Sequence, residues 1–227
     1  MTKSRDAVDC VTKLRPPAEG DLVPRSDVSA ALMDAAERLF AEHGIATVSD
    51  RKVAAAAQNT NNSAVAYYFG GRPGLLRAMI DRHLEALEAP RRELFAQSDS
   101  LLGDVKALVV PVTDALAGLP QPTWRARFLG QAIHDPATAQ LLRDSAEQAP
   151  TAAEVFASLV SRLHALGTLD HDETAARVSL MTHVVVSACA DIERRSHAHG
   201  RPARWSEAGR FLSDAIAGML TGPVTPH

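Results

Sequence analysis

Apolar residues recur at helical spacing along most of this chain, and that periodicity constrains the fold more than any other feature. Leu32, Ala35, Ala36, Leu39 and Phe40, for example, fall on one face of a helix. No segment shows the strict alternation of a strand, and no repeat is visible. Aromatic residues make up only 4% of the chain, so its core must be aliphatic, which suits helices better than a sandwich or barrel. We therefore expect an all-α protein.

Turn and capping residues divide the chain into helices. The first should run from a cap at Ser26 or Asp27 to Gly44, and the second should start at Ser49-Asp50. A short third helix is expected over 61–68, and a fourth from Pro73 to about Pro90. Further helical blocks are expected near 91–98, 101–117, 122–133, 136–147, 150–166, 171–198 and 203–221.

The segment NTNNSAVAYYFGGRPGLL, residues 59–76, has an unusual composition. It holds all the asparagines and both tyrosines of the 227-residue chain. Two short helices joined by a tight turn, with a third behind them, form the helix-turn-helix plan. Asparagine can pair bidentately with adenine, and tyrosine hydroxyls reach phosphates. These features predict a DNA-binding surface.

Local charge agrees with that interpretation. Residues 51–80 contain four basic side chains, Arg51, Lys52, Arg72 and Arg77, and no acidic one, although the whole chain has a net charge of −3. The alternative is that Asn59 and Thr60 are only turn and cap residues, that Tyr68 is a buried ring, and that the basic run is a solvated face. The concentration of all these features in one three-helix unit favours DNA binding.

The segments LMDAAERLFAEHGIATVSDRKVAAAA and SAVAYYFGGRPGLLRAM, within residues 28–80, resemble the tetracycline-repressor (TetR) family of transcriptional regulators. The resemblance implies that Asn62 reads a base, that Arg51 touches a base or phosphate, and that Tyr67, Tyr68 and Arg72 contact phosphate. Ala66 departs from the family's usual tyrosine, and the turn is one residue longer, so the register from Thr60 to Ser63 is open by one. The expected DNA-contacting residues are Arg51, Thr60, Asn61, Asn62, Ser63, Tyr67, Tyr68 and Arg72.

The sequence pattern gives the domain boundaries, and the resemblance implies the role of the C-terminal part and its partners. We expect a disordered tail over 1–24, a helix-turn-helix domain over 25–80, an effector-binding and dimerisation domain over 81–222, and a C-terminal tail over 223–227. Residues 81–227 hold 14 basic and 18 acidic side chains, so this part should not hold DNA. The helices over 171–198 and 203–221 carry apolar or small residues on more than one face, which indicates burial against both the core and a partner chain.

The resemblance therefore predicts a repressor that binds a palindromic double-stranded operator as a homodimer and is released by a small apolar or amphipathic effector. Scarce aromatic and histidine residues could line the effector pocket. For each of them taken singly, core packing or a surface location is an alternative. The candidates are His83, Phe95, Trp124, Phe128, His134, Phe156 and His183.

Other classes of function find little support in the sequence. The chain has no Glu-x-x-His, GxSxG, GxGxxG or GxxxxGK[ST] motif, so we expect no enzyme, no metal site and no cofactor. Cys10 and Cys189 are too far apart in sequence to suggest a metal cluster. We also expect no membrane span, no signal peptide and a cytoplasmic location. The rival from another class is a helical carrier of an apolar molecule that does not bind DNA.

Overall fold

The computed structural model describes residues 25–223. Within that range the chain forms ten helices and no strand, which confirms the expected all-α class. In chain order the helices are α1 (Arg25–His43), α2 (Asp50–Ala56), α3 (Ala64–Phe69), α4 (Arg72–Ala96), α5 (Leu101–Ala117), α6 (Arg125–His134), α7 (Pro136–Glu147), α8 (Pro150–Ala165), α9 (His171–His199) and α10 (Trp205–Thr221).

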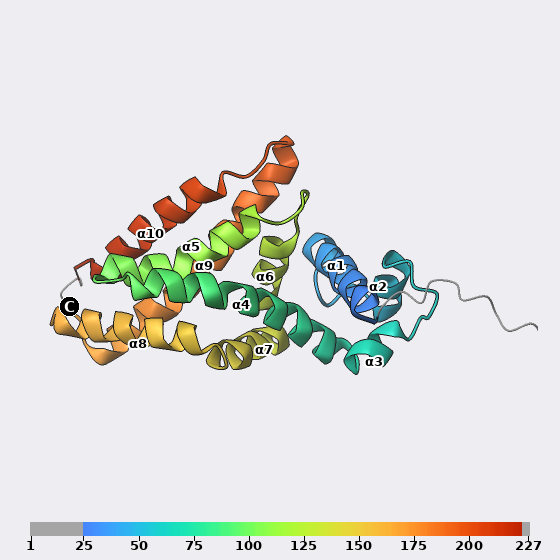
Figure 1. Cartoon of the computed structure of the whole chain (residues 1–227), viewed down its shortest axis with the longest axis horizontal. Coiled ribbons are helices and arrows are strands. Elements are labelled where there is room, and N and C mark those ends of the chain that lie inside the picture. Colours follow the sequence, from blue (N-terminus) through green and yellow to red (C-terminus); the bar gives the residue numbers. More distant parts are fainter. Residues whose placement is uncertain (1–24, 224–227) are drawn as a thin grey trace, which may run out of the picture.

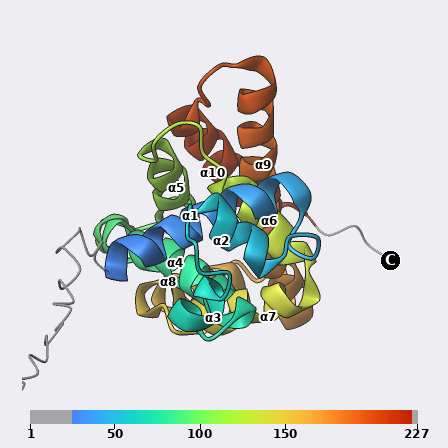
Figure 2. The same cartoon turned by 90° about the vertical axis from the view of Figure 1, so that its right-hand side faces the viewer.

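The helices are arranged as a small end unit and a larger bundle. Helices α1, α2 and α3 lie together at one end of the molecule, and α4 runs from that end into the bundle made by the later helices (Figure 1). Figure 2 looks at the molecule from the end that carries α1, α2 and α3. Along α4, Leu75 and Met79 are buried in the end unit, whereas Leu94 and Phe95 pack against the core of the bundle. Helix α4 is thus a continuous connection between the two parts.

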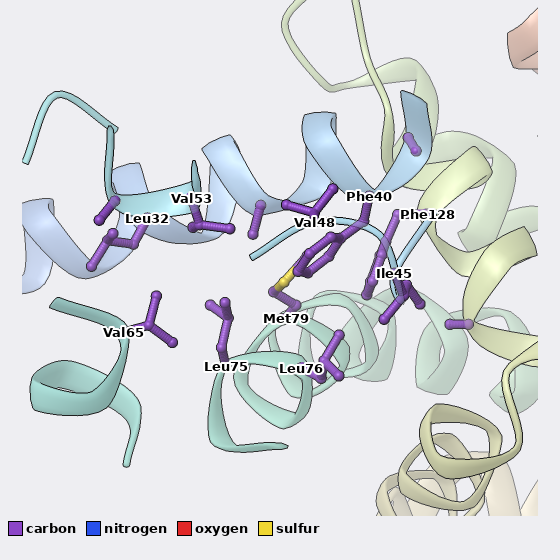
Figure 3. Close-up of a cluster of buried hydrophobic side chains, with 14 of the residues drawn as sticks. Leu32, Phe40, Ile45, Val48, Val53, Val65, Leu75, Leu76, Met79 and Phe128 are labelled. Atoms are coloured by element: carbon purple, nitrogen blue, oxygen red, sulfur yellow. The ribbon is translucent and has the colours of Figure 1, made fainter. Parts of the chain in front are cut away.

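The core of the end unit is aliphatic apart from two phenylalanines. Leu32 and Phe40 of α1 meet Val65 of α3 and Met79 of α4 (Figure 3). Phe128 of α6 joins them, with its ring centroid 6.2 Å from that of Phe40. Aromatic rings at this separation attract each other beyond their burial of apolar area. Helix α6 therefore belongs to both parts of the molecule.

The bundle has a second core in which small residues allow close helix contacts. A Cβ at Gly130 of α6 would lie 2.9 Å from the Cβ of Ala190 in α9. A Cβ at Gly209 of α10 would collide with the side chain of Thr113 in α5. Interiors are packed at crystal-like density, so either added methyl group would force the two helices apart.

The expected helix boundaries need three corrections. Helix α4 does not end near Pro90 but continues to Ala96, so 91–98 is not a separate block. Pro90 is exposed while Leu87 and Arg91 on either side of it are buried, so packing of the inner face holds the helix together through the proline. Helix α1 begins at Arg25, which places Ser26 and Asp27 within its first turn and not at its cap. The third correction, at residues 61–68, concerns the site.

Residues 1–24 and 224–227, which include the expected N-terminal tail and all but the first residue of the expected C-terminal tail, lie outside the described range. Within that range, α9 is the one helix long and apolar enough to span a membrane by length and composition. Only 22% of its apolar window is buried within this single chain, although the helix packs against α6, α8 and α10. Much of its apolar surface therefore remains available to a partner.

Candidate DNA-binding surface and effector cavity

The turn between α2 and α3 is built by asparagine side chains. Asn59 Oδ1 accepts a hydrogen bond from the backbone N–H of Asn61 at 2.9 Å, and Asn61 Oδ1 accepts one from the N–H of Ser63 at 2.9 Å. Such side-chain bonds stabilise turns in competition with helix. The expected helix over 61–68 therefore begins at Ala64, and Asn62 precedes it. Gln58, with φ of 55°, adopts the left-handed conformation that favours glycine at this position.

The polar residues of this segment are exposed together, while two small apolar residues anchor them. Ala64 and Val65 of α3 are fully buried against the end-unit core. The exposed residues of the turn and of α2 and α3 include six of the eight expected DNA contacts, which are Arg51, Asn61, Asn62, Ser63, Thr60 and Tyr67. Tyr68 and Arg72 are partly buried. We call the six exposed residues, together with Tyr68, the α2–α3 surface.

Arg25, at the start of α1, adds a cation to the α2–α3 surface. Its guanidinium carbon lies 5.2 Å from the ring centroid of Tyr67 and 5.7 Å from that of Tyr68. The two tyrosine rings contact each other edge to face at 5.0 Å. Tyr67 is 63% exposed, so its hydroxyl is open to a ligand while Arg25 and Tyr68 support the ring.

Arg72 has internal partners. Its Nε and Nη2 donate to Asp50 Oδ1 at 3.0 and 2.7 Å, and its Nη1 donates to the Ile45 carbonyl at 2.8 Å. Nη2 also donates to the Val48 carbonyl, and the guanidinium lies over the ring of Phe40. The first residue of α4 is thereby tied to the loop before α2. In this arrangement Arg72 orients α2 relative to α4.

The bundle contains a mostly apolar, partly open cavity of about 160 Å³ between α4, α5, α6, α7, α8 and α9. We call it the bundle cavity. Of the seven expected effector contacts, His83 of α4 and Phe156 of α8 line it. The lining also includes Leu84, Leu87, Arg91, Leu108, Val109, Val112, Leu116, Ala126, Leu129, Leu142, Ala146, Ala149, Ala152, Met181, Thr182, Val185, Val186 and Cys189.

The other five expected effector contacts lie elsewhere. Phe128 is in the end-unit core, and Trp124 packs beside it with its ring against His197. Phe95 packs against the bundle core. His134 and His183 are exposed. The candidates were selected because aromatic and histidine residues are scarce in this chain. Only two of them line the bundle cavity, because most of its lining is aliphatic. Arg91 was missed, although it lies eight residues from His83 on one face of α4.

Three ionisable side chains of the cavity wall are strongly affected by burial. Burial lowers the pKa of His83 to about 3, and the charges of Arg125 and Arg91 act in the same direction. Burial also lowers the pKa of the Arg91 guanidinium, against the attraction of Glu88. The pKa of the Cys189 thiol is raised to about 12 by burial and by the charge of Glu193. His83 and Cys189 are therefore both neutral at pH 7.

Buried ion pairs join the end unit to the bundle. Glu37 of α1 accepts from Arg125 Nε of α6 at 3.0 Å and from Arg82 Nη2 of α4 at 3.2 Å. Arg82 also pairs with Asp34 at 2.8 Å. The pKa of Glu37 is raised, because burial outweighs the opposing effect of Arg125 and Arg82. Glu37 of α1 is thus bonded to both α4 and α6, and these two helices also line the bundle cavity.

Helix α6 is in turn held by α9. Trp124, at the N-terminal cap of α6, makes no side-chain capping bond. Glu193 of α9 supplies the acceptor instead, taking the N–H of Arg127 at 2.9 Å, the N–H of Ala126 at 3.4 Å and the Thr123 hydroxyl. A carboxylate at this position also faces the positive end of the helix dipole.

The fold and the α2–α3 surface together define a helix-turn-helix DNA-binding protein with a helical C-terminal part. Residues 32–79 match the model of the bacterial regulatory proteins, tetR family. The N-terminal part of the chain is thus similar to the DNA-binding part of this family, and the described chain has the fold of TetR-family transcription regulators. Among curated proteins, no sequence matches it significantly. Among residues 25–223, no group of three or more His, Cys, Asp or Glu side chains is placed to hold a metal ion.

Solved structures of bacterial regulators share the fold. A putative tetR family transcription regulator from Shewanella sp. PV-4 is 19% identical with a TM-score of 0.57, over 84% of this chain and 95% of that one. A TetR family transcription regulator from Marinobacter aquaeolei VT8 is 16% identical with a TM-score of 0.57, over 86% and 96%. The fatty acid degradation regulator FadR from Bacillus halodurans is 13% identical with a TM-score of 0.61, over 89% and 98%. At these identities the likeness concerns the fold.

Proposed function

We propose that this chain is a repressor that binds a two-fold symmetric operator as a homodimer and is released by a small molecule in the bundle cavity. The observation that carries the DNA-binding part is the α2–α3 surface, where amide, hydroxyl and guanidinium groups are exposed together without a free carboxylate among them. Asp50, which precedes Arg51 in the sequence, is paired with Arg72. We further propose that residues 25–80 form the DNA-binding domain and residues 81–222 the effector-binding and dimerisation domain.

Within the α2–α3 surface, we assign base readout to Asn62 and neighbouring Thr60, Asn61 and Ser63, and phosphate contacts to Arg51, Tyr67 and Tyr68. The Asn61 oxygen already accepts the Ser63 N–H, whereas the exposed Asn62 amide makes no hydrogen bond to another described residue. Asn62 is therefore the better reader of adenine, which needs a donor and an acceptor together. Arg72 would contribute to DNA binding by orienting α2. It would contact a DNA phosphate only if its bonds to Asp50 and the loop carbonyls were broken.

Selection of binding sites from a random DNA pool separates these roles. Asn62→Ala should relax the preference at one position per half-site, at a cost on the order of 1–3 kcal/mol. Tyr67→Phe should weaken all sequences equally, because a phosphate contact carries no base identity. Asn59→Ala is the structural control, since it removes a turn bond. If Asn62→Ala keeps the wild-type preference, the assignment of base readout is wrong.

The proposed dimer forms through α9 and α10. Leu180 of α9 is 50% exposed and Phe211 of α10 is 69% exposed. Ala176, Ser179 and Ser187 extend the exposed face of α9 with small side chains, and Ala215 and Gly218 do the same for α10. Large exposed apolar side chains surrounded by small ones are typical of an interface, and a two-fold axis pairs the same face on both subunits.

Light scattering on the purified chain tests the dimer. The wild type should have twice the mass of the 24.2 kDa chain at micromolar concentration. Leu180→Asp or Phe211→Asp should yield monomers and abolish tight operator binding, because one helix-turn-helix reads only a few base pairs. Leu166→Asp, at the 51% exposed leucine that ends α8, is the control and should remain a dimer. A wild-type monomer would exclude the proposal.

The effector should act by binding the bundle cavity more tightly in the form that cannot bind DNA. By linkage, it then lowers DNA affinity by the same factor. The rival function is a small-molecule carrier, which the apolar bundle cavity also fits. A gel-shift assay with DNA from upstream of the chain's own gene distinguishes the two, since a carrier would bind the small molecule but shift no DNA.

A further inference from the structure

Two polar side chains are buried in the wall of the bundle cavity. His83 and Arg91 of α4 are each only 5% exposed. Within the described residues, His83 Nδ1 and Arg91 Nε are buried and have no hydrogen-bond partner. Buried polar groups are normally paired, and leaving one unpaired is unfavourable. Each unpaired atom therefore marks a place where a ligand could supply the missing partner.

Arg91 has hydrogen-bonding capacity to spare. Its Nη1 donates to Glu88 Oε1 at 3.3 Å, through one oxygen only. The other oxygen of Glu88 accepts the backbone N–H of Thr151 at 3.1 Å, so this carboxylate is shared between two donors. A guanidinium carries five N–H donors arranged to meet a carboxylate through two parallel bonds. A ligand carboxylate fits the Nε side of Arg91.

The charges near the cavity favour an anion over a cation. His83 is neutral, since burial and the guanidiniums of Arg125 and Arg91 oppose its protonation. Arg125 is already paired with Glu37. Burial, the larger cause, disfavours a charge of either sign. The guanidinium charges, the smaller cause, favour a negative group over an ammonium.

The size and the lining of the cavity determine the size and polarity of the part of the ligand that lies away from the carboxylate. A volume of about 160 Å³ is close to that of an engineered apolar cavity of about 150 Å³ in another protein that binds benzene. The wall beyond His83 and Arg91 is mostly aliphatic, with Phe156 on one side. This part, the body of the ligand, should therefore be apolar and no larger than about one ring or a short branched chain.

We propose that the bundle cavity binds a small organic monocarboxylate, with its carboxylate on the guanidinium of Arg91 and its apolar body between α5, α6, α8 and α9. This inference rests on the proposed effector function. His83 lies eight residues before Arg91 on α4, which is about 12 Å along a helix axis, with Leu87 between them. One carboxylate does not contact both, so His83 is placed to bond a hydroxyl or carbonyl at the other end of the ligand.

Calorimetric titration of the full chain with benzoate, cyclohexanecarboxylate, benzamide and benzylamine tests the proposal. The two carboxylates should bind at least tenfold more tightly than the neutral amide, and benzylamine should not bind. Arg91→Met should remove the preference for carboxylate, whereas Arg91→Lys should keep part of it. Arg92→Met changes the exposed neighbour on the same helix and should behave as the wild type.

Arg91→Met leaves Glu88 with a buried charge, so it could fail to fold. The double variant Glu88→Gln/Arg91→Met removes both charges and should fold, again without the carboxylate preference. Equal affinity for benzoate and benzamide, no binding of either carboxylate, or an unchanged preference in the double variant would overturn the proposal.

A parallel gel shift separates this inference from the proposed function. Release of DNA by benzoate in the wild type but not in Arg91→Met would support both. Binding of benzoate through Arg91 without release of DNA would support the ligand class and contradict effector release. Release of DNA by benzamide or benzylamine in place of the carboxylates would support effector release and overturn the ligand class.

Discussion

Arg125 Nε of α6 lies 3.0 Å from Glu37 Oε2 of α1, and the two side chains are only 12% and 11% exposed. This ion pair crosses from the bundle to the end unit. Arg82 of α4 donates to the same oxygen. The carboxylate therefore balances two guanidiniums from α4 and α6, and both of these helices line the bundle cavity and contact α1. A shift of α6 relative to α4 would alter at least one of the two bonds.

Glu37→Gln should destabilise the protein and weaken communication between its two parts. The substitution keeps the shape but leaves Arg125 buried without an anion, which should cost roughly 2–3 kcal/mol in the free energy of unfolding. Glu42→Gln is the control on the same helix, because its pairs with Arg38 and His43 are 3.9 Å long and more exposed. That control should cost less than about 1 kcal/mol.

Urea unfolding measures the stability of both variants, and operator affinity with and without a bound small molecule measures the communication. Equal effects of Glu37→Gln and Glu42→Gln on stability would show that the buried pair contributes no more than a surface pair.

Glu193→Ala should loosen the start of α6. The backbone N–H groups of Ala126 and Arg127 would lose their acceptor, and Arg127, 3.5 Å away through Nε, would lose its anion. We expect a loss of about 3 kcal/mol and faster hydrogen exchange at these two amides. Glu207→Ala, in an exposed pair with Arg204 on α10, should leave both quantities nearly unchanged. Unchanged exchange at Ala126 and Arg127 in Glu193→Ala would contradict this role.

The sequence predicted the parts of this molecule that depend on local pattern. The apolar stripe of α1 and the caps at Gly44 and Ser49 were correct, because periodicity and capping act within a few residues. The start of α3 was placed too early, since the Asn59 and Asn61 side chains bond to the turn and not to a helix. Asparagine occurs both in turns and at the start of helices, so composition alone could not decide where the turn ends and α3 begins.

Relationships between distant segments were not predictable in the same way. Glu193 caps a helix that begins 68 residues earlier, and nothing near Glu193 in the sequence indicates that role. Phe128 was expected in an effector pocket but packs against Phe40, because the crossing of α6 over α1 decides which face of α6 is buried where. Arg91 follows an exposed proline, and its sequence context is that of a surface arginine. Only the packing of the folded bundle buries it.

The neutral, buried His83 predicts a loss of stability in mild acid. Its pKa is about 3 in the folded protein, lowered from the 6.5 of an ordinary histidine. The unfolded chain therefore takes up this proton first, and the contribution of His83 is present above pH 6.5 and lost as the pH falls toward 3. Between pH 7 and pH 5 the wild type should lose about 2 kcal/mol more than His83→Gln.

Urea unfolding at both pH values and one protein concentration measures this difference. His134→Gln, at an exposed histidine, is the control and should follow the wild type. Parallel profiles for wild type and His83→Gln would show that water or a proton reaches His83 in the folded protein.

Cys189 should react slowly with thiol reagents while the bundle is folded. Burial and the charge of Glu193 raise the pKa of its thiol to about 12, from a usual 9.0. Only the thiolate is nucleophilic, so at pH 8 ionisation alone should make the native thiol about a thousandfold slower than the same thiol in the unfolded chain. Cys10→Ser leaves Cys189 as the one cysteine, because the sequence has two.

Reaction of that variant with an excess of iodoacetamide, in buffer and in urea, measures the ratio. A ligand such as benzoate in the bundle cavity should slow the native reaction further, since Cys189 lines the same wall. A native rate within tenfold of the unfolded rate would mean that the bundle opens often enough to expose its interior, and that the cavity is open to solvent without a ligand.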